Sequence, residues 1–136
     1  MNTITISTTI NADSDKIWKF WNEPAHIEKW AFASNDWECP HAENNLQVGS
    51  SFKTVMSAKD KSSSFDFIGT YTNIIPNRVI EYTMEDGRKV SILFEPVEEG
   101  TIIIETFDPE SQNTLELQRE GWQSILNNFK KYVEEN

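Results

Sequence analysis

The spacing of apolar residues changes along the chain and predicts strands and helices in turn. Isoleucines alternate with threonine and serine over residues 4–10, which predicts an opening β-strand. Helical spacing follows the candidate caps Asn11 and Asp13, and Pro24 is placed to begin a second helix. Two short helices are therefore expected directly after the first strand.

Short apolar segments separated by turn residues fill the middle of the chain. Strands are expected over residues 48–58, 64–75, 79–84, 89–97 and 101–107. Their connections are short, so neighbouring strands should pair antiparallel, with one face covered and the other wet. Residues 32–46 contain Cys-Pro and Asn-Asn dipeptides and are expected to form a loop, extended only briefly at residues 37–39 before Pro40. A sheet of about six strands follows from this count.

Residues 112–132 have the pattern of a long amphipathic helix. Its apolar stripe consists of Trp122, Ile125, Leu126, Phe129 and Val133. Ser111 or Asn113 is expected to cap its first turn. Gly121 lies in the middle of this helix, where glycine costs roughly 1 kcal/mol relative to alanine. Two interpretations of Gly121 stay open: a close approach to the sheet, or space beside the helix for a bound molecule.

Length and composition narrow the class of protein. The 136 residues predict one α+β domain over residues 1–136, in which a sheet packs against the long helix. The 22 acidic and 12 basic side chains give a net charge of -10, which disfavours binding to nucleic acid. No run of apolar residues is long enough to predict a membrane span.

Few residues suit metal, redox or nucleotide chemistry. Cys39 is the only cysteine, so no internal disulfide is expected, and the N-terminus lacks a signal-peptide pattern, which favours the cytoplasm. One cysteine and two histidines are too few for a zinc site, so Cys39, His41, His26 and Glu43 are assigned no metal-binding role, and a nucleophilic Cys39 activated by His41 is not expected. Glycine-rich phosphate loops are missing from the sequence, and no cofactor is expected.

The order of the elements and a set of short stretches carry a resemblance to a known family. These stretches are Ile17-Trp18, Trp37-Glu38-Cys39-Pro40, Ala42-Glu43-Asn44-Asn45-Leu46, Val48-Gly49, Phe65-Asp66-Phe67, Gly69-Thr70-Tyr71, Asp86-Gly87-Arg88 and Gly121-Trp122-Gln123. The chain resembles the START-like helix-grip (SRPBCC) superfamily and, within it, homologues of the C-terminal domain of the activator of the ninety-kilodalton heat-shock-protein ATPase. The resemblance covers nearly the whole chain.

The resemblance implies a curved antiparallel sheet wrapped around the C-terminal helix. Between them it implies a pocket, which relatives use for sterols, lipids, polyketides or flavonoid-like compounds. Eukaryotic activators are described as carrying a separate N-terminal domain that binds the chaperone. This chain begins directly at the first strand of the helix-grip domain, so chaperone activation is not expected.

Aromatic residues on inward strand positions are the strongest chemical signal. Each one alone is more often a core residue than a ligand contact. Together they are expected to form the pocket wall of the helix-grip arrangement, with the ligand-binding set Trp30, Trp37, Phe52, Met56, Phe67, Tyr71, Tyr82, Phe94, Trp122 and Ile125. The leading hypothesis is a carrier or sensor that binds a small hydrophobic molecule.

Two other functions stay open. A cyclase- or dehydratase-like enzyme acting on a polyketide-type substrate would need a pocket acid or base, and Glu105, Asp66 and His41 are the candidates. A protein-interaction module would resemble the chaperone activators instead. An enzyme is the less favoured of these readings, because no catalytic signature is present.

The orientation of Glu105 has two alternatives. If Ile103 and Phe107 point inward, Glu105 does too, and burial raises its pKa so that it could act as an acid or base. If Ile102 and Ile104 point inward instead, Glu105 faces water. The exposed orientation is expected, because burying an unpaired carboxylate is costly.

Overall fold

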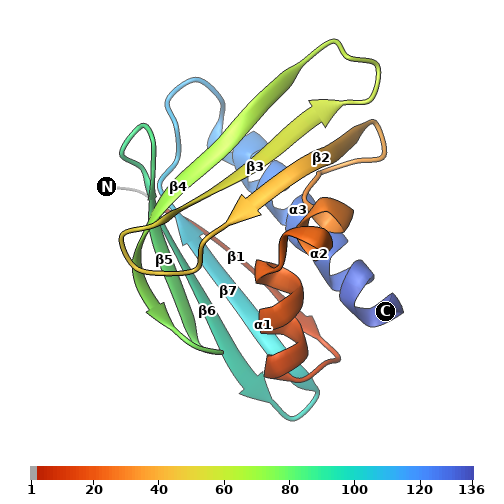
Figure 1. The fold of residues 1–136 in the computed structure, drawn as a ribbon, viewed down its shortest axis with the longest axis vertical. Helices are drawn as coiled ribbons and strands as arrows, with labels where there is room; N and C mark the ends of the chain where they lie inside the picture. The colour runs from red at the N-terminus through yellow and green to blue at the C-terminus, as the bar shows by residue number, and fades with distance from the viewer. Residues whose placement is uncertain (1–2) are drawn as a thin grey trace.

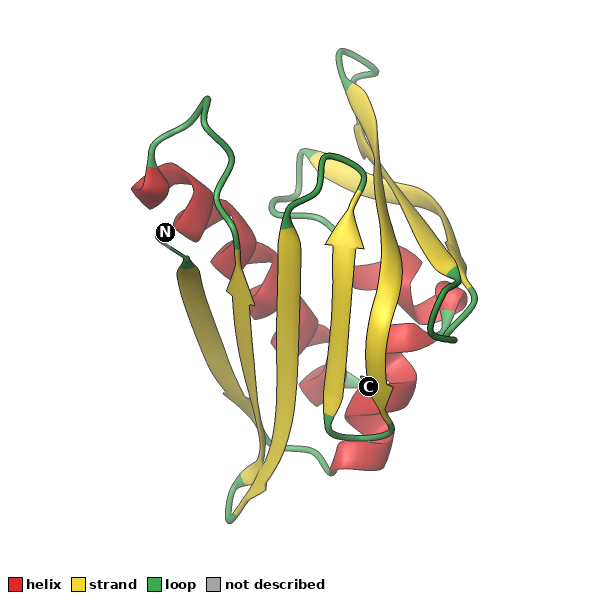
Figure 2. Ribbon diagram, turned by 90° about the vertical axis from the view of Figure 1, so that its left-hand side faces the viewer, coloured by secondary structure: helices red, strands yellow, loops and turns green. Residues whose placement is uncertain are grey.

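The computed structural model describes residues 3–136. Its elements in chain order are β1 (Ile4–Ile10), α1 (Ser14–Asn22), α2 (Pro24–Trp30), β2 (Trp37–Asn44), β3 (Ser51–Ala58), β4 (Ser64–Ile75), β5 (Val79–Met84), β6 (Lys89–Val97), β7 (Gly100–Phe107) and α3 (Leu115–Glu135). The seven strands form one antiparallel sheet in the order β1-β7-β6-β5-β4-β3-β2. The sheet curls into a half-barrel (Figure 1), and the three helices lie on one side of it (Figure 2). The predicted α+β helix-grip arrangement is confirmed.

The seventh strand, β2, corrects the predicted loop over residues 32–46. It begins at Trp37 and pairs antiparallel with β3, with a shift of register between Glu38 and His41. Pro40 falls inside that shift, and β2 is an edge strand, which is where a sheet tolerates a residue without an N–H. The irregularity also breaks the alternation of apolar residues, because Cys39 and Ala42 are both buried. The sequence pattern therefore hid a strand.

The helix starts confirm some predicted caps and correct others. Asp13 caps α1 by accepting a hydrogen bond from the N–H of Lys16 at 2.9 Å, and Pro24 occupies the first turn of α2, as predicted. The long helix begins at residue 115, and its cap is Thr114, whose hydroxyl accepts from the N–H of Leu117 at 3.1 Å. Ser111 and Asn113 were the wrong candidates.

The residues before α3 are held by a separate set of hydrogen bonds. The Glu110 carboxylate accepts from the backbone N–H groups of Gln112 and Asn113, at 3.1 and 2.7 Å. The buried amide of Gln118 donates to the backbone oxygens of Glu110 and Asn113, at 3.1 and 2.9 Å. These contacts close a turn ahead of the helix, which explains why α3 starts later than its polar pattern predicts.

The register of β7 places Glu105 inside the protein, so the expectation of an exposed Glu105 is wrong. Ile103 and Phe107 are 0% and 1% exposed, and Glu105 between them is 6% exposed. Its neighbours across the sheet are Ile6 of β1 and Ile92 of β6, both buried. Both phases of β7 offer isoleucines to the core, so apolar alternation alone did not distinguish them.

The solid part of the core lies where β1, β6 and β7 meet α1 and the second half of α3. Ile4, Ile10, Ile17, Phe129 and Val133 are at most 1% exposed there. The ring of Phe129 packs edge-on against Trp21 and Trp30, with centroids 4.9 and 4.7 Å away. Within residues 3–136, no helix is both long and apolar enough to cross a membrane.

Candidate functional site

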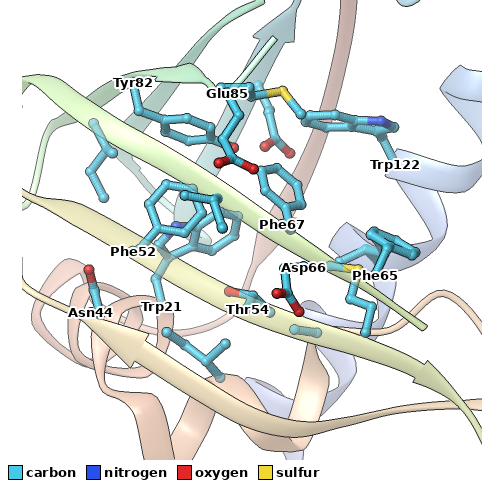
Figure 3. A pocket seen from close by; sticks show the side chains of 18 of the residues that line it. Trp21, Asn44, Phe52, Thr54, Phe65, Asp66, Phe67, Tyr82, Glu85 and Trp122 are labelled. Atoms are coloured by element: carbon cyan, nitrogen blue, oxygen red, sulfur yellow. The ribbon is translucent and has the colours of Figure 1, made fainter.

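A cavity of about 460 Å³ lies between the inner face of β2 to β5 and the helices. Aromatic side chains line it from several elements: Trp21 of α1, Trp30 of α2, Phe52 of β3, Tyr82 of β5 and Trp122 of α3. Figure 3 shows Trp21, Phe52, Tyr82 and Trp122 among the side chains that line the cavity. The cavity is therefore bounded on most sides by apolar surface.

The cavity exists because α3 lies close to only one part of the sheet. The backbone of α3 approaches β1, α1 and α2 and stands away from β3, β4 and β5. In its second half Phe129 and Val133 are fully buried, whereas Trp122 and Ile125 in the first half are only partly buried and line the cavity. A Cβ atom added at Gly121 would meet nothing within 4 Å. The interpretation of Gly121 as a point of close approach is therefore wrong.

Gly69 of β4 lets two aromatic rings form the cavity wall. A Cβ atom at this position would lie 2.6 Å from Cε2 of Phe52 and 2.7 Å from Cδ1 of Tyr82. The two rings pack edge to face across the glycine, with centroids 4.8 Å apart at 81°. A larger residue at position 69 would push at least one ring away, so the glycine positions the wall.

Trp122 is fixed at the opposite wall by stacking. Its ring lies parallel to that of Phe107 of β7, with centroids 3.8 Å apart and planes at 10°. Phe67 of β4 approaches the same indole at 5.9 Å. The ring is therefore held in one orientation between α3 and the sheet, where it lines the cavity.

Four buried polar side chains of the inner sheet face line the cavity: Glu105, Tyr82, Tyr71 and Thr54, of which Thr54 is 7% exposed. Glu105 is buried, and burial raises its pKa to about 8. Tyr82 is also buried, and its pKa is raised first by burial and then by the charge of Glu105. The hydroxyl of Tyr71 donates to the side-chain oxygen of Asn44 at 2.5 Å, and burial raises the pKa of Tyr71. No positive charge in the described chain offsets the burial of Glu105.

The mouth of the cavity is acidic. Asp66 at the start of β4 and the turn from β5 to β6, with Glu85 and Asp86, line it. Arg88 is the one cationic side chain among the lining residues of the described chain, and its Nε donates to Asp86 at 2.8 Å. Figure 3 shows Glu85 and Asp66 on either side of Phe67. Asp66 pairs with Lys53 at 3.8 Å, so Glu85 is the one carboxylate of the three without an ion pair in the described chain.

Most of the predicted ligand-binding set lies around this one cavity. Trp30, Phe52, Met56, Phe67, Tyr71, Tyr82, Trp122 and Ile125 all line it. Trp37 and Phe94 lie elsewhere. Trp37 is near Phe65 at the sheet edge, with ring centroids 5.9 Å apart, and Phe94 is 1% exposed and packs against Trp18 at 5.3 Å. A ligand-binding role for the residues that line the cavity stays a prediction.

Other lining residues were missed by the sequence reasoning. Trp21 shares the helical stripe of α1 with Ile17 and Phe20, and its ring lies 5.0 Å from that of Trp30 of α2 and lines the cavity. The sequence shows that Trp21 belongs to this stripe, but it does not show which residues lie beside it in the folded protein. Glu105 was a candidate acid or base in the sequence but was expected to be exposed, because its phase depended on the pairing of β7 with β1 and β6.

Cys39 and His41 do not form a reactive pair. The Cys39 thiol is buried and donates to the backbone oxygen of His41 at 3.4 Å, and burial raises its pKa to about 11. The His41 ring points outward and contacts Glu43 at 2.8 Å. Over residues 3–136, no three His, Cys, Asp or Glu side chains are grouped to hold a metal ion. His41 also lies outside the cavity lining, unlike Glu105 and Asp66.

A half-barrel of antiparallel strands that holds one long C-terminal helix, with a cavity between them, defines the START-like helix-grip class of proteins. Comparison with protein families then gives the particular group. The profile of the family described as Activator of Hsp90 ATPase homolog 1-like protein matches residues 11–134. The chain belongs to this family, which confirms the resemblance found in the sequence.

Solved structures give the same result. An AHSA1-like protein from Aeromonas hydrophila is 40% identical over 98% of this chain and 93% of its own, with a TM-score of 0.93. A protein from Cytophaga hutchinsonii is 53% identical over 100% of this chain and 94% of its own, with a TM-score of 0.85. At 22% identity, a protein from Chromobacterium violaceum shows a shared fold alone, covering 98% and 97% of the two chains with a TM-score of 0.86. A comparison with curated proteins finds no match.

Proposed function

We propose that this protein binds a small, mainly apolar molecule in the cavity between the sheet and α3, as a carrier or sensor. The observation that carries the proposal is the aromatic cavity itself. Its volume of about 460 Å³ falls within the range of roughly 300–1,000 Å³ that is usual for small-molecule sites. A few polar groups among apolar walls are also typical of such sites. The apolar walls bind the ligand by burying its surface, and the polar groups fix its orientation.

Binding is tested by titrating the protein with a flavonoid, a fatty acid and a sterol. Trp21, Trp30 and Trp122 line the cavity, so a bound guest should change tryptophan emission in a saturable way. Equilibrium dialysis with the same compounds checks that the optical change reports binding. If none of the three classes gives saturable binding by either method, the proposal is contradicted.

A cavity-filling variant tests the location. Met56→Trp adds a large ring on the inner face of β3 and should weaken binding at least about tenfold, because a guest and the new indole would need the same space. Val55→Trp is the matched control, since adjacent residues of a strand point to opposite faces. It should leave the affinity within about twofold. Dialysis suits both variants because their emission differs from that of the natural protein.

A second candidate is a protein-interaction role like that of the chaperone activators. Membership of the Activator of Hsp90 ATPase homolog 1-like family supports it. The test is a pull-down with the middle region of an Hsp90-type chaperone, followed by measurement of its ATPase rate. Binding to the chaperone without small-molecule binding would favour this role over the carrier.

The enzymatic alternative rests on Glu105. A buried carboxyl group with a raised pKa, facing a cavity, has the properties of a general acid or base. Asp66 lies at the mouth and is exposed. Turnover of a polyketide-type substrate that is lost in Glu105→Gln would support this alternative over simple binding.

A further inference from the structure

Glu105 is a buried acid without a hydrogen-bond partner. Its side chain is 6% exposed and faces the cavity from β7. None of the hydrogen bonds or ion pairs found over residues 3–136 involves its carboxyl group, and its neighbours across the sheet are Ile6 and Ile92. A buried polar group without a partner is costly, and native proteins usually satisfy such groups. Residues 3–136 supply no hydrogen-bond partner here, so the partner is water in the cavity or a guest that displaces it.

Tyr82 offers a second polar group to the same space. It is 7% exposed and lines the cavity from β5, and its hydroxyl makes no hydrogen bond within the described chain. Tyr71 differs in this respect, because its hydroxyl is already used by Asn44. Glu105 and Tyr82 lie within electrostatic reach of each other, since the charge of Glu105 raises the pKa of Tyr82. Glu105 and Tyr82 therefore share one apolar cavity without hydrogen-bond partners of their own in the described chain, and Thr54 adds a smaller hydroxyl group on β3.

The surroundings keep Glu105 in its neutral form. Isoleucines flank it on β1 and β6, and α3 contributes only apolar side chains to the cavity, Trp122, Ile125 and Leu126. Burial raises the pKa of Glu105 to about 8, so at pH 7 the carboxyl group is mostly protonated and can donate a hydrogen bond. The titratable and charged groups that share the cavity lining are Tyr71, Tyr82, Asp66, Glu85, Asp86 and Arg88.

The acidic mouth restricts the charge of a guest. Asp86 pairs with Arg88 and Asp66 pairs with Lys53, so Glu85 is the carboxylate at the mouth that no cation of the described chain neutralises, and its charge disfavours anions. An ammonium group would enter past the carboxylates, but it would have to lose its water beside apolar walls and ionise Glu105, which is expensive in such a site. A neutral guest avoids both costs.

We infer that Glu105 and Tyr82 select neutral guests with a carbonyl oxygen, to which both side chains donate hydrogen bonds inside the cavity. The inference rests on the proposed function and adds the class of ligand to it. A protonated carboxyl group and a phenol each carry one O–H donor, and a carbonyl oxygen has two lone pairs to accept them. Aryl ketones of the polyketide or flavonoid type have this chemistry, whereas fatty-acid anions do not.

Matched diphenyl compounds test the selection. Benzophenone and diphenylmethane have nearly the same shape and differ in the carbonyl oxygen, while diphenylmethylamine and diphenylacetate supply cationic and anionic counterparts. Equilibrium dialysis at pH 6 should give benzophenone an affinity roughly three- to tenfold above that of diphenylmethane, the ratio expected for a net hydrogen bond. At pH 9 the ratio should fall, because Glu105 has lost its proton and Tyr82 alone still donates. Diphenylacetate should bind most weakly.

Variants assign the effect to Glu105. Glu105→Leu should lower the preference for benzophenone at pH 6 to the part that Tyr82 supplies, and should remove its pH dependence, while diphenylmethane still binds. Glu105→Gln keeps an N–H donor and should retain the preference without its pH dependence. Tyr82→Phe should reduce the preference at pH 6. Glu95→Gln, an exposed position on β6, is the matched control and should change nothing. Circular dichroism confirms that each variant is folded.

The outcomes separate this inference from the proposed function. Equal binding of benzophenone and diphenylmethane would overturn the selection by Glu105 and leave the binding cavity in place. Tightest binding by diphenylmethylamine, increasing as the pH rises, would also overturn it, because Glu105 would then act as an anion. Failure of every diphenyl compound to bind, while the flavonoid, fatty acid or sterol still binds, would overturn this inference alone, whereas failure of both sets of compounds would contradict the proposed function as well.

Discussion

The two halves of α3 pack in opposite ways against the same sheet. The second half, with Phe129 and Val133, is part of a solid core with β1, α1 and α2. The first half, with Trp122 and Ile125, stands off from β3 to β5 and leaves a cavity. One amphipathic helix thus serves as a core element over one part of its length and as a cavity wall over the other.

This difference shows which part of the fold supplies stability and which part is available for binding. The closed half is filled by branched and aromatic side chains with almost no exposure, which is the close packing of ordinary protein interiors. The open half keeps its rings in place by contacts at its margins, such as the stack of Trp122 on Phe107 and the rings held over Gly69. The stability of the closed half allows the open half to leave apolar surface uncovered.

Truncation of one phenylalanine in each half should give the largest measurable difference between the two halves. Phe129→Ala removes a ring that is 0% exposed and packed between Trp21 and Trp30, and should lower the free energy of unfolding by about 3–5 kcal/mol. Phe52→Ala removes a ring that already borders the cavity, and should cost about half as much. Urea denaturation of both variants measures the difference. Equal losses would show that the open half is packed as tightly as the closed half.

The second largest effect should be the contribution of the buried Glu105 to the pH dependence of stability. A glutamate has a pKa of 4.5 when unfolded, and burial raises the pKa of Glu105 to about 8 in the folded protein. Between these values the folded state holds a proton that the unfolded state releases, so the contribution of Glu105 is fully present below pH 4.5 and is lost as the pH rises through 8. At pH 7 the loss amounts to about 3 kcal/mol, from roughly 1.4 kcal/mol per pKa unit.

The variant Glu105→Gln isolates this contribution, because glutamine does not titrate. The difference in unfolding free energy between variant and natural protein should favour the variant increasingly from pH 5 to pH 9. Glu95→Gln, exposed on β6, is the control and should follow the natural protein. A constant difference over this range would mean that Glu105 is ionised in the folded state.

The sequence predicted the fold more fully than the site, and the reason differs from residue to residue. Helical and alternating spacing are local properties, so α1, α2, α3 and the meander could be read directly. Strand β2 was not predicted because it contains Pro40. The shift of register that accommodates this proline arises only when β2 pairs with β3. The phase of β7, and with it the burial of Glu105, depends on two partner strands. The separation of core residues such as Phe94 from cavity residues such as Phe52 depends on the position of α3, which no local pattern contains.

The smallest expected effect concerns Gly121, which lies where the open half of α3 begins. A methyl group there would meet no atom within 4 Å, so Gly121→Ala should raise the stability of the protein by about 1 kcal/mol, the gain in helix propensity alone. Asn127→Ala is a control at an exposed position of the same helix, although it also removes a hydrogen bond from Gln123. Thermal denaturation with and without benzophenone measures both effects. A stabilised Gly121→Ala that binds as before would show that the glycine is needed neither for packing nor for the cavity, whereas a destabilised variant would mean that α3 lies closer to its surroundings than this arrangement allows.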